Sequence, residues 1–188
     1  MENQKLSYIS WAVLIGAVLI LAGWFLTRSS NANTKPFSFA INDSVSKKAV
    51  TVGFEYPKDW NEMATDKAES KLGSLKTPKT YVLIDKQTLT MMGLKGAQAV
   101  VNQRNFEEYT EISSEDLKIN DLNAVKIGFS YTDNGINMQA CQVLVDLKTN
   151  AKDMIVITYF APEKDYAKSI GDFGKLIKSI SITSSNLK

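Results

Sequence analysis

The feature that most constrains this chain is a run of 22 residues without a charge at positions 6–27. The middle of the run, positions 11–24, is apolar almost throughout. An α-helix rises about 1.5 Å per residue, so the run would span roughly 33 Å, close to a bilayer hydrocarbon core of about 30 Å. A terminal run of this length rarely has enough protein around it to form a buried helix of a soluble core. We therefore predict a transmembrane anchor over residues 6–27.

Four residues near the two ends of this run are expected at the membrane interfaces. Tyr8 and Trp11 lie towards one end and Trp24 towards the other, and the rings of Tyr and Trp favour the headgroup region. Arg28 directly follows the run, where its charge can reach the headgroups. We predict that these side chains contact the lipid bilayer and that residues 1–5 form a short cytoplasmic tail.

A cleaved secretory signal is the main alternative to an anchor. Signal peptides have a shorter apolar region, of about 7–15 residues, followed by small residues at the cleavage site. Residues 30–32 place small side chains suitably, and cleavage after Ala32 would release a secreted, soluble binding protein. The greater length of the apolar run favours the uncleaved anchor, and both alternatives stay open here.

The orientation in the membrane follows only weakly from charge. Lys5 and the terminal amine lie on one side of the run and Arg28 on the other, so the positive charges nearly balance. A long domain can be translocated whatever its charge. We expect a single-pass membrane protein whose C-terminal domain lies outside the cytoplasm.

The rest of the chain predicts a linker and one domain. Residues 28–35 are polar and small, which is typical of a solvated linker, residues 36–183 predict the domain, and residues 184–188 a tail. Three of the 22 basic and one of the 20 acidic residues fall in the first 35 positions, which leaves 19 of each sign. A domain without excess positive charge lacks the signature of a nucleic-acid-binding protein, so no nucleic acid is expected as a partner.

The composition excludes several kinds of catalytic and metal site. The chain has no histidine, which excludes Ser–His and Cys–His catalysis and His-ligated zinc. Its one cysteine excludes an internal disulfide. Acidic residues gather between positions 107 and 121, but without the glycine-containing Asp/Asn-rich loop of a calcium site, so they predict a solvated acidic face. We expect no catalytic residue, no metal site and no cofactor. The acidic residues are Glu107, Glu108, Glu111, Glu115, Asp116 and Asp121.

Alternating apolar residues predict β-strands over 37–41, 50–56 and 79–85. The clearest β pattern lies further along. Residues 124–131 alternate, Asn134-Gly135 predicts a hairpin turn, and residues 136–147 form the returning strand. Residues 154–160 are apolar nearly throughout, as in a central strand covered on both faces, which completes a three-stranded meander.

An amphipathic helix is predicted to follow, beginning at Pro162. Its apolar stripe recurs at spacings of three and four and comprises Tyr166, Ile170, Phe173, Ile177 and Ile180. The final residues suit either the end of this helix or a short edge strand.

The region 93–120 does not give one pattern. Gly93 to Gly96 lacks the Gly-Lys-Ser/Thr end of a phosphate-binding loop and predicts a turn. Residues 97–112 mix helical spacing with a strand-like Ala-Val-Val run, and residues 113–116 suit a turn or a helix start. The secondary structure of this region therefore stays open.

Three further side chains are interpreted as core residues. Cys141 shares a strand face with Val143 and Val145, which favours a buried thiol over a nucleophile or an intermolecular bridge. Tyr56 and Trp60 flank a strand end, where packing against the edge of the core is favoured over lining a ligand groove.

Several of these pieces together resemble the PsbP-like family, which includes Mog-type proteins and small bacterial envelope lipoproteins. They are a strand ending in Tyr56-Pro57-x-x-Trp60, then Leu122-Asn123-Ala124 leading into the meander, then Pro162 and a C-terminal amphipathic helix. The resemblance covers roughly residues 37–183. It implies an α+β fold, an α/β/α sandwich with a central antiparallel sheet. The lipid-modified cysteine of the envelope lipoproteins is absent, and the predicted helix over 6–27 would replace it.

The resemblance also implies a non-catalytic accessory or assembly factor. We expect a membrane-anchored extracytoplasmic binding module that assists an envelope or membrane complex. Its partners would be the lipid bilayer and a protein at the membrane. The alternative is a hydrolase that uses carboxylates or a Ser–Lys pair, which two converging acids in a polar cleft would favour.

Overall fold

The computed structural model describes residues 33–43, 48–63, 70–74, 79–88, 93–148 and 153–186. The predicted anchor over 6–27 lies outside these ranges. Within them, no helix is both long enough and apolar enough to cross a membrane. The strands are β1 (Thr34–Asp43), β2 (Lys48–Pro57), β3 (Trp60–Met63), β4 (Ser70–Ser74), β5 (Tyr81–Thr88), β6 (Glu107–Ile119), β7 (Leu122–Asp133), β8 (Ile136–Asp146), β9 (Asp153–Pro162) and β10 (Ser181–Asn186), and the helices are α2 (Gly93–Asn105) and α3 (Glu163–Ser179).

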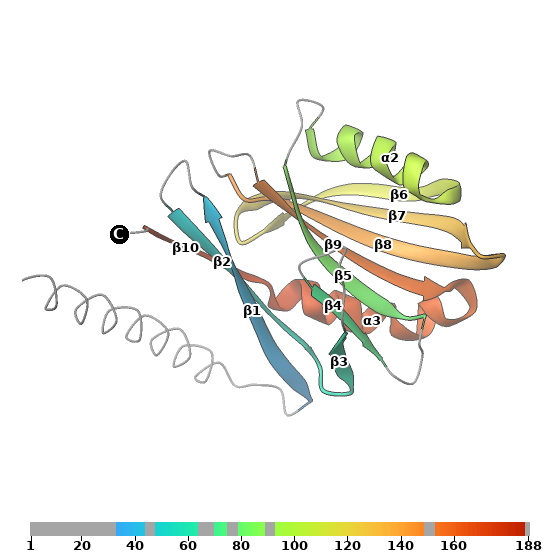
Figure 1. Cartoon of the computed structure of the whole chain (residues 1–188), viewed down its shortest axis with the longest axis horizontal. Helices are drawn as coiled ribbons and strands as arrows, with labels where there is room; N and C mark the ends of the chain where they lie inside the picture. Colours follow the sequence, from blue (N-terminus) through green and yellow to red (C-terminus); the bar gives the residue numbers. More distant parts are fainter. Residues whose placement is uncertain are drawn as a thin grey trace, which may run out of the picture.

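Two antiparallel sheets carry the fold (Figure 1). The larger has seven strands in the order β3-β4-β5-β9-β8-β7-β6, and the smaller has the order β1-β2-β10. The predicted meander β7-β8-β9 lies within the larger sheet and is confirmed. Its first turn uses Asn134 at φ 50° and Gly135 at φ 74°, the left-handed conformations that a two-residue hairpin needs. Strand β9 is buried from Asp153 to Ala161, because both faces of the sheet are covered there.

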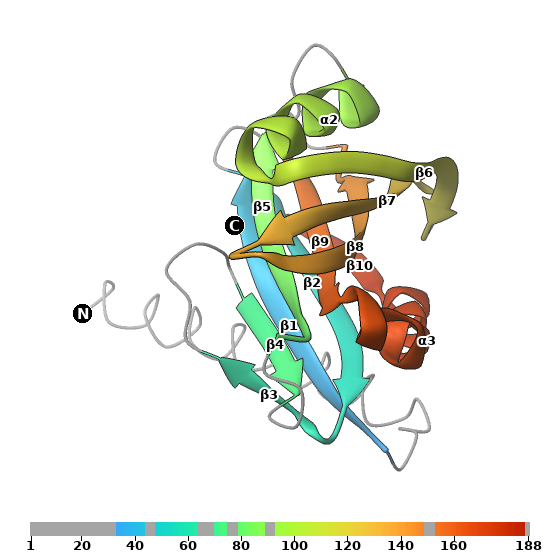
Figure 2. The same cartoon turned by 90° about the vertical axis from the view of Figure 1, so that its right-hand side faces the viewer.

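The two helices cover opposite faces of the larger sheet (Figure 2). Alternate residues of each strand point to opposite faces, so β8 directs Cys141, Val143 and Val145 to one core and Ala140 and Leu144 to the other. Helix α3 and the small sheet cover the first core, and α2 covers the second. The structure is thus an α+β sandwich around a central antiparallel sheet, as predicted.

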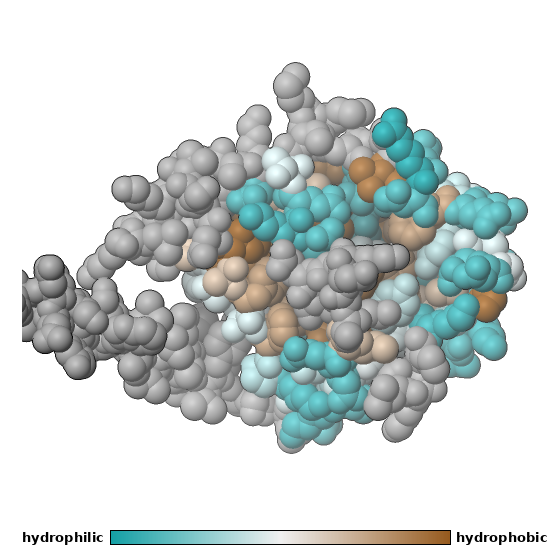
Figure 3. Space-filling view, in the orientation of Figure 1, coloured by the Kyte–Doolittle hydropathy of each residue, from teal (hydrophilic) through white to brown (hydrophobic). Residues whose placement is uncertain are grey.

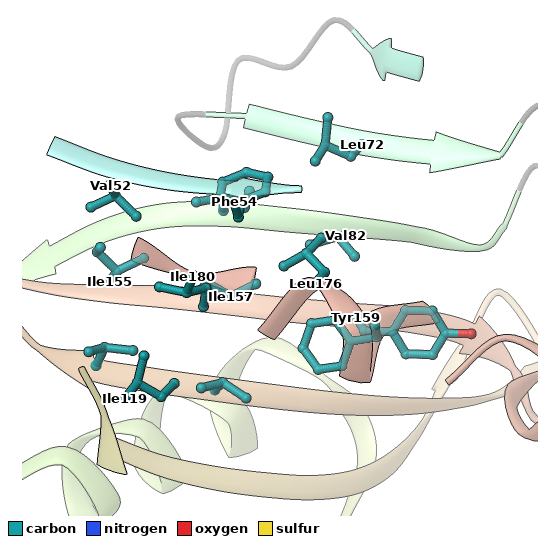
Figure 4. Close-up of a cluster of buried hydrophobic side chains, with 14 of the residues drawn as sticks. Val52, Phe54, Leu72, Val82, Ile119, Ile155, Ile157, Tyr159, Leu176 and Ile180 are labelled. Carbon is teal, nitrogen blue, oxygen red and sulfur yellow. The ribbon is translucent and has the colours of Figure 1, made fainter. Parts of the chain in front are cut away.

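The core between the larger sheet, α3 and the small sheet joins side chains from every described element except α2. Figure 4 shows Val52 and Phe54 of β2 facing Ile155 and Ile157 of β9, with Leu176 of α3 beside them. Burying large aliphatic and aromatic side chains contributes about 1.5–3 kcal/mol each, which makes this cluster the main stabilising unit. The predicted apolar stripe of α3 points into it, with α3 starting directly after Pro162 as its N-cap.

In the region 93–120 the sequence patterns did not predict the observed helix and strand. Gly93 to Gly96 begins α2 instead of forming a turn, and residues 113–116 lie inside β6 instead of forming a turn or starting a helix. Strand β6 is the edge of the seven-stranded sheet, and most of its side chains are exposed. An exposed strand interrupted by register shifts has no reason to alternate apolar and polar residues, so its sequence carries little β signal.

The described domain extends beyond the predicted bounds 36–183 at both ends. Strand β1 begins at Thr34, inside the predicted linker 28–35, because Thr34 pairs with Pro57 and its hydroxyl donates to Glu55 Oε2 at 2.8 Å. Strand β10 reaches Asn186, inside the predicted tail 184–188, through backbone pairing with β2. Pairing with β2 recruits these polar residues at both ends.

Candidate functional site

The four residues predicted at the membrane interfaces, Tyr8, Trp11, Trp24 and Arg28, lie outside the described residues. That prediction stays a prediction. The candidate site on the described domain is a hollow of about 320 Å³ at the end of the sheet where β7 turns into β8. We call it the end pocket. Its described lining consists of Glu108, Ile112, Ser130, Tyr131, Thr132, Asn137, Met138, Gln139 and Glu163.

Strand register brings the walls of the end pocket together. Thr132 of β7 lies opposite Glu107 of β6 on one side and opposite Asn137 of β8 on the other. Met138 of β8 in turn lies opposite Pro162, the last residue of β9. Because α3 starts directly after Pro162, this register places the first residue of the helix, Glu163, against the same end of the sheet.

A bulge in the edge strand directs the Glu108 side chain to the pocket. The register of β6 shifts between Glu107 and Thr110, and Glu108 has a φ of 53°, in the left-handed region that few non-glycine residues adopt. A bulge re-aims the side chain at the extra residue. Here the hydroxyl of Thr132 donates a hydrogen bond to Glu108 Oε2 and holds the carboxylate at the pocket.

A second register shift exposes an isoleucine at the rim. This shift lies between Glu111 and Ser113, so Ile112 has no partner on β7. The Ile112 residue is 55 % exposed. Ile136, at the start of β8, is 38 % exposed. In Figure 3 the end of the molecule where β7 turns into β8 is mostly hydrophilic, with a small hydrophobic spot within it. The pocket therefore combines polar walls with an apolar rim.

The end pocket carries negative charge. Its described lining includes two carboxylates, Glu108 and Glu163, and no lysine or arginine. Burial raises the pKa of the Tyr131 phenol well above its usual value, with the charges of Tyr81 and Asp133 adding to the effect, so this lining group stays neutral. Uncharged hydroxyl and amide groups of Ser130, Asn137 and Gln139 complete the lining.

The described lining supplies one feature of the predicted hydrolase alternative, two carboxylates in a polar hollow, but not the other, a Ser–Lys pair. A Ser–Lys pair needs a lysine near the serine, and the described pocket lining that includes Ser130 contains none. No group of three or more metal-ligating side chains occurs among the described residues either. The arrangement suits recognition: acceptors, neutral hydrogen-bonding groups and an exposed apolar side chain.

Cys141 lies where the sequence placed it. It is 2 % exposed and packs with Val143 and Val145 in the core between the sheet and α3, so the core interpretation is confirmed. Burial raises the pKa of its thiol to about 11, although the charge of Lys126 and a hydrogen bond with Tyr166 of α3 act in the opposite direction. The thiol is therefore protonated and unreactive at neutral pH. Tyr56 and Trp60 are also buried in this core.

The predicted acidic face is strand β6 together with its turn to β7. Glu107, Glu111 and Asp121 are exposed, as expected of a solvated face. Glu115 forms a 2.8 Å ion pair with Lys126 of β7, and the lysine lowers the pKa of that carboxyl by hydrogen bonding and charge. Among the acidic residues predicted between positions 107 and 121, Glu108 is the one that lines the end pocket. No local sequence signal marks it, because its role depends on a bulge and on β7, 24 residues away.

A buried chain of amides fixes α2 to the sheet. Gln98 Nε2 donates to Asn102 Oδ1 at 3.0 Å, Asn102 Nδ2 donates to Gln142 Oε1 of β8 at 3.1 Å, and Gln142 Nε2 donates to Thr158 Oγ1 of β9 at 2.9 Å. All four residues are at most 4 % exposed. This chain gives a weakly amphipathic helix a specific position, since buried polar groups are costly unless they are paired.

Comparisons with known proteins support the fold. No protein-family model matches the chain, and no curated protein matches its sequence. Among solved structures, LpqN of Mycobacterium tuberculosis, described as involved in cell envelope biogenesis, is similar with a TM-score of 0.59, 12 % identity, and coverage of 79 % of this chain and 91 % of LpqN.

Two more solved structures share this architecture. Cyanobacterial PsbP from Synechocystis is similar with a TM-score of 0.52 and 14 % identity, and the Ran-binding protein Mog1p from Saccharomyces cerevisiae with a TM-score of 0.52 and 9 % identity. Each alignment covers 83 % of this chain and 96 % of the other. The described domain therefore has the PsbP/Mog1-like fold, as the resemblance predicted.

Proposed function

We propose that this protein is a membrane-anchored accessory module whose domain lies outside the cytoplasm and binds a protein partner, assisting the assembly or stability of an envelope or membrane complex. The observation that carries the proposal is the fold, which it shares with LpqN, described as acting in cell envelope biogenesis, and with cyanobacterial PsbP. The uncharged run at 6–27 supports the anchor.

The end pocket supports a binding role for the domain. Its described lining offers hydrogen-bond acceptors and an apolar rim, whereas Cys141, the one cysteine of the chain, is buried with a raised pKa. The exposed Ile112 adds apolar surface to these hydrogen-bonding groups, so the lining can contact both parts of an amphipathic ligand.

Site-specific photo-cross-linking tests the proposal. The full-length chain carries a photoreactive amino acid at Ile136, beside the end pocket, or at Lys175, an exposed position on α3. We expect one discrete protein adduct in the membrane fraction from position 136 and none from position 175. Absence of any adduct at position 136, or recovery of the chain in the soluble fraction only, would contradict the proposed function.

A further inference from the structure

We infer that the end pocket receives the side chain of an arginine or lysine from the protein partner. The cationic head would lie between the carboxylates of Glu108 and Glu163, and the methylene stem would pack on Ile112. This inference rests on the proposed function, because it names the chemistry by which the domain recognises its partner.

Charge is the first argument. Two of the nine described lining residues are carboxylates, and the others are uncharged. The carboxylate of Glu108 already accepts a hydrogen bond from Thr132, but an ionised carboxylate has about four acceptor sites, so it can accept further hydrogen bonds from a cation. An anionic ligand would be repelled by both carboxylates, which leaves cationic and neutral ligands.

The apolar rim distinguishes a basic side chain from a small inorganic cation. Long basic side chains bury their methylene groups on apolar surface while the charged head stays among polar groups. Ile112 is 55 % exposed and lines the same pocket as the exposed carboxylates of Glu108 and Glu163. A ligand with a cationic head and an aliphatic stem gains from both features, whereas a bare cation gains only from the carboxylates.

The shape of the edge favours insertion of a side chain over addition of a strand. A partner strand that extended the sheet would need a regular row of backbone groups along β6. The register shifts at Glu107–Thr110 and Glu111–Ser113 interrupt that row beside the pocket. A hollow of about 320 Å³ is at the lower end of the range for ligand sites, about 300–1,000 Å³, and is large enough for one side chain rather than a helix.

Peptide titration of the full-length chain in detergent micelles tests this inference. The probes are acetyl-Gly-Arg-Gly-amide and the same peptide with citrulline, which keeps the shape of arginine and removes its charge. We expect amide NMR signals of Thr132, Asn137 and Gln139 to shift with the arginine peptide and not with the citrulline peptide. Affinity should fall as salt is raised, because the carboxylates are partly exposed to solvent.

Variants of the two carboxylates test whether they bind the cationic head of the peptide. Glu108→Gln and Glu163→Gln should each weaken binding of the arginine peptide about two- to fivefold, as expected for partly exposed ion pairs, and the double variant about tenfold. The matched control is Glu115→Gln, which removes the same charge from the same strand outside the described pocket lining and should change the affinity less than twofold. Ile112→Ser should weaken both the arginine peptide and a lysine analogue.

The outcomes separate this inference from the proposed function. Equal binding of the arginine and citrulline peptides would show a neutral, hydrogen-bonding ligand and overturn the inference. So would an equal loss in Glu115→Gln, or no binding of either peptide to tens of millimolar. If the wild type forms the photo-adduct at position 136 but the arginine peptide fails these tests, the protein-binding function stands and the proposed basic side chain is rejected. If no adduct forms in the wild type, the proposed function itself fails.

Discussion

The backbone amide of Glu55 in β2 donates a 2.7 Å hydrogen bond to Ser179 Oγ in the last turn of α3, 124 residues along the chain. The same hydroxyl lies 2.7 Å from the carbonyl of Leu176, to which it donates. Two residues later, Ser181 begins β10 opposite Gly53. Ser179 thus fixes the point where the helix ends and the chain joins the small sheet.

Replacing this serine should destabilise the domain. In Ser179→Ala the half-buried amide of Glu55 loses its acceptor, and we expect the free energy of unfolding to fall by about 1–2 kcal/mol. Urea unfolding of the full-length chain in mild detergent, followed by tryptophan fluorescence, measures the change. Ser181→Ala is the control, because its hydroxyl makes a longer, 3.3 Å bond to Gly53 and should matter less. Equal effects of the two variants would contradict the role of Ser179.

The Cys141 thiol should resist alkylation in the folded protein. It is 2 % exposed, and the fraction present as thiolate is small at neutral pH because burial raises its pKa to about 11. A thiol reagent at neutral pH should label the urea-unfolded chain rapidly and the native chain slowly. Rapid labelling of the native chain would show an accessible thiol and revive the nucleophile or bridge interpretation.

The same thiol should make stability depend on pH in the alkaline range. Its pKa rises from an ordinary value of 9.0 to about 11 on folding, so between these values the unfolded chain loses the proton first. The contribution of the protonated thiol is complete below pH 9.0 and is lost as the pH rises towards about 11, by roughly 2 kcal/mol.

Comparison with Cys141→Ala isolates this effect from other groups that titrate at alkaline pH. The variant should be about 1 kcal/mol less stable than the wild type below pH 9.0, because a small cavity forms. Near pH 11 it should become the more stable of the two. A difference between the two proteins that does not change with pH would contradict the buried thiol pKa.

The stability that the amide chain under α2 contributes should depend mainly on its central residue, Asn102. Asn102→Leu removes the acceptor of Gln98 and the donor to Gln142 together, leaving two buried polar groups unpaired, and should cost about 2–4 kcal/mol. Gln98→Met lies at the end of the chain, where Oε1 has no hydrogen-bond partner among the described residues, and it leaves one buried group, Asn102 Oδ1, unpaired, so it should cost about 1 kcal/mol. Thermal or urea unfolding compares the two variants. A larger cost for Gln98→Met would contradict this ranking.

The N-terminal run should keep the protein in the membrane. We expect the full-length chain to stay in the membrane fraction through carbonate and high-salt washing. Replacing both Leu19 and Ile20 with arginine should release it, because each charge at the centre of a membrane helix costs about 2.5–3.5 kcal/mol on insertion scales. Replacing both with alanine is the control and should leave it bound. Removal of the wild type by salt alone would contradict the anchor.

The sequence by itself determined the elements whose side-chain pattern repeats locally. The meander from β7 to β9 and the stripe of α3 follow from alternation, from Asn134-Gly135 and from a 3.6-residue period, and each has one face or both in a core. The burial of Cys141 followed from the same alternation. Core burial imposes a periodic choice of residues, so periodicity predicts it.

Only the tertiary structure decided the edge strand and the end pocket. Strand β6 is mostly exposed and bulged, so nothing in its own sequence required alternation, and its residues suited a turn or helix equally well. The end pocket joins Glu108 of β6, Thr132 of β7 and Glu163 of α3, three residues that only strand register brings together. A contact between distant segments leaves no local period in the chain, because it is specified by the pairing of whole strands rather than by neighbouring residues.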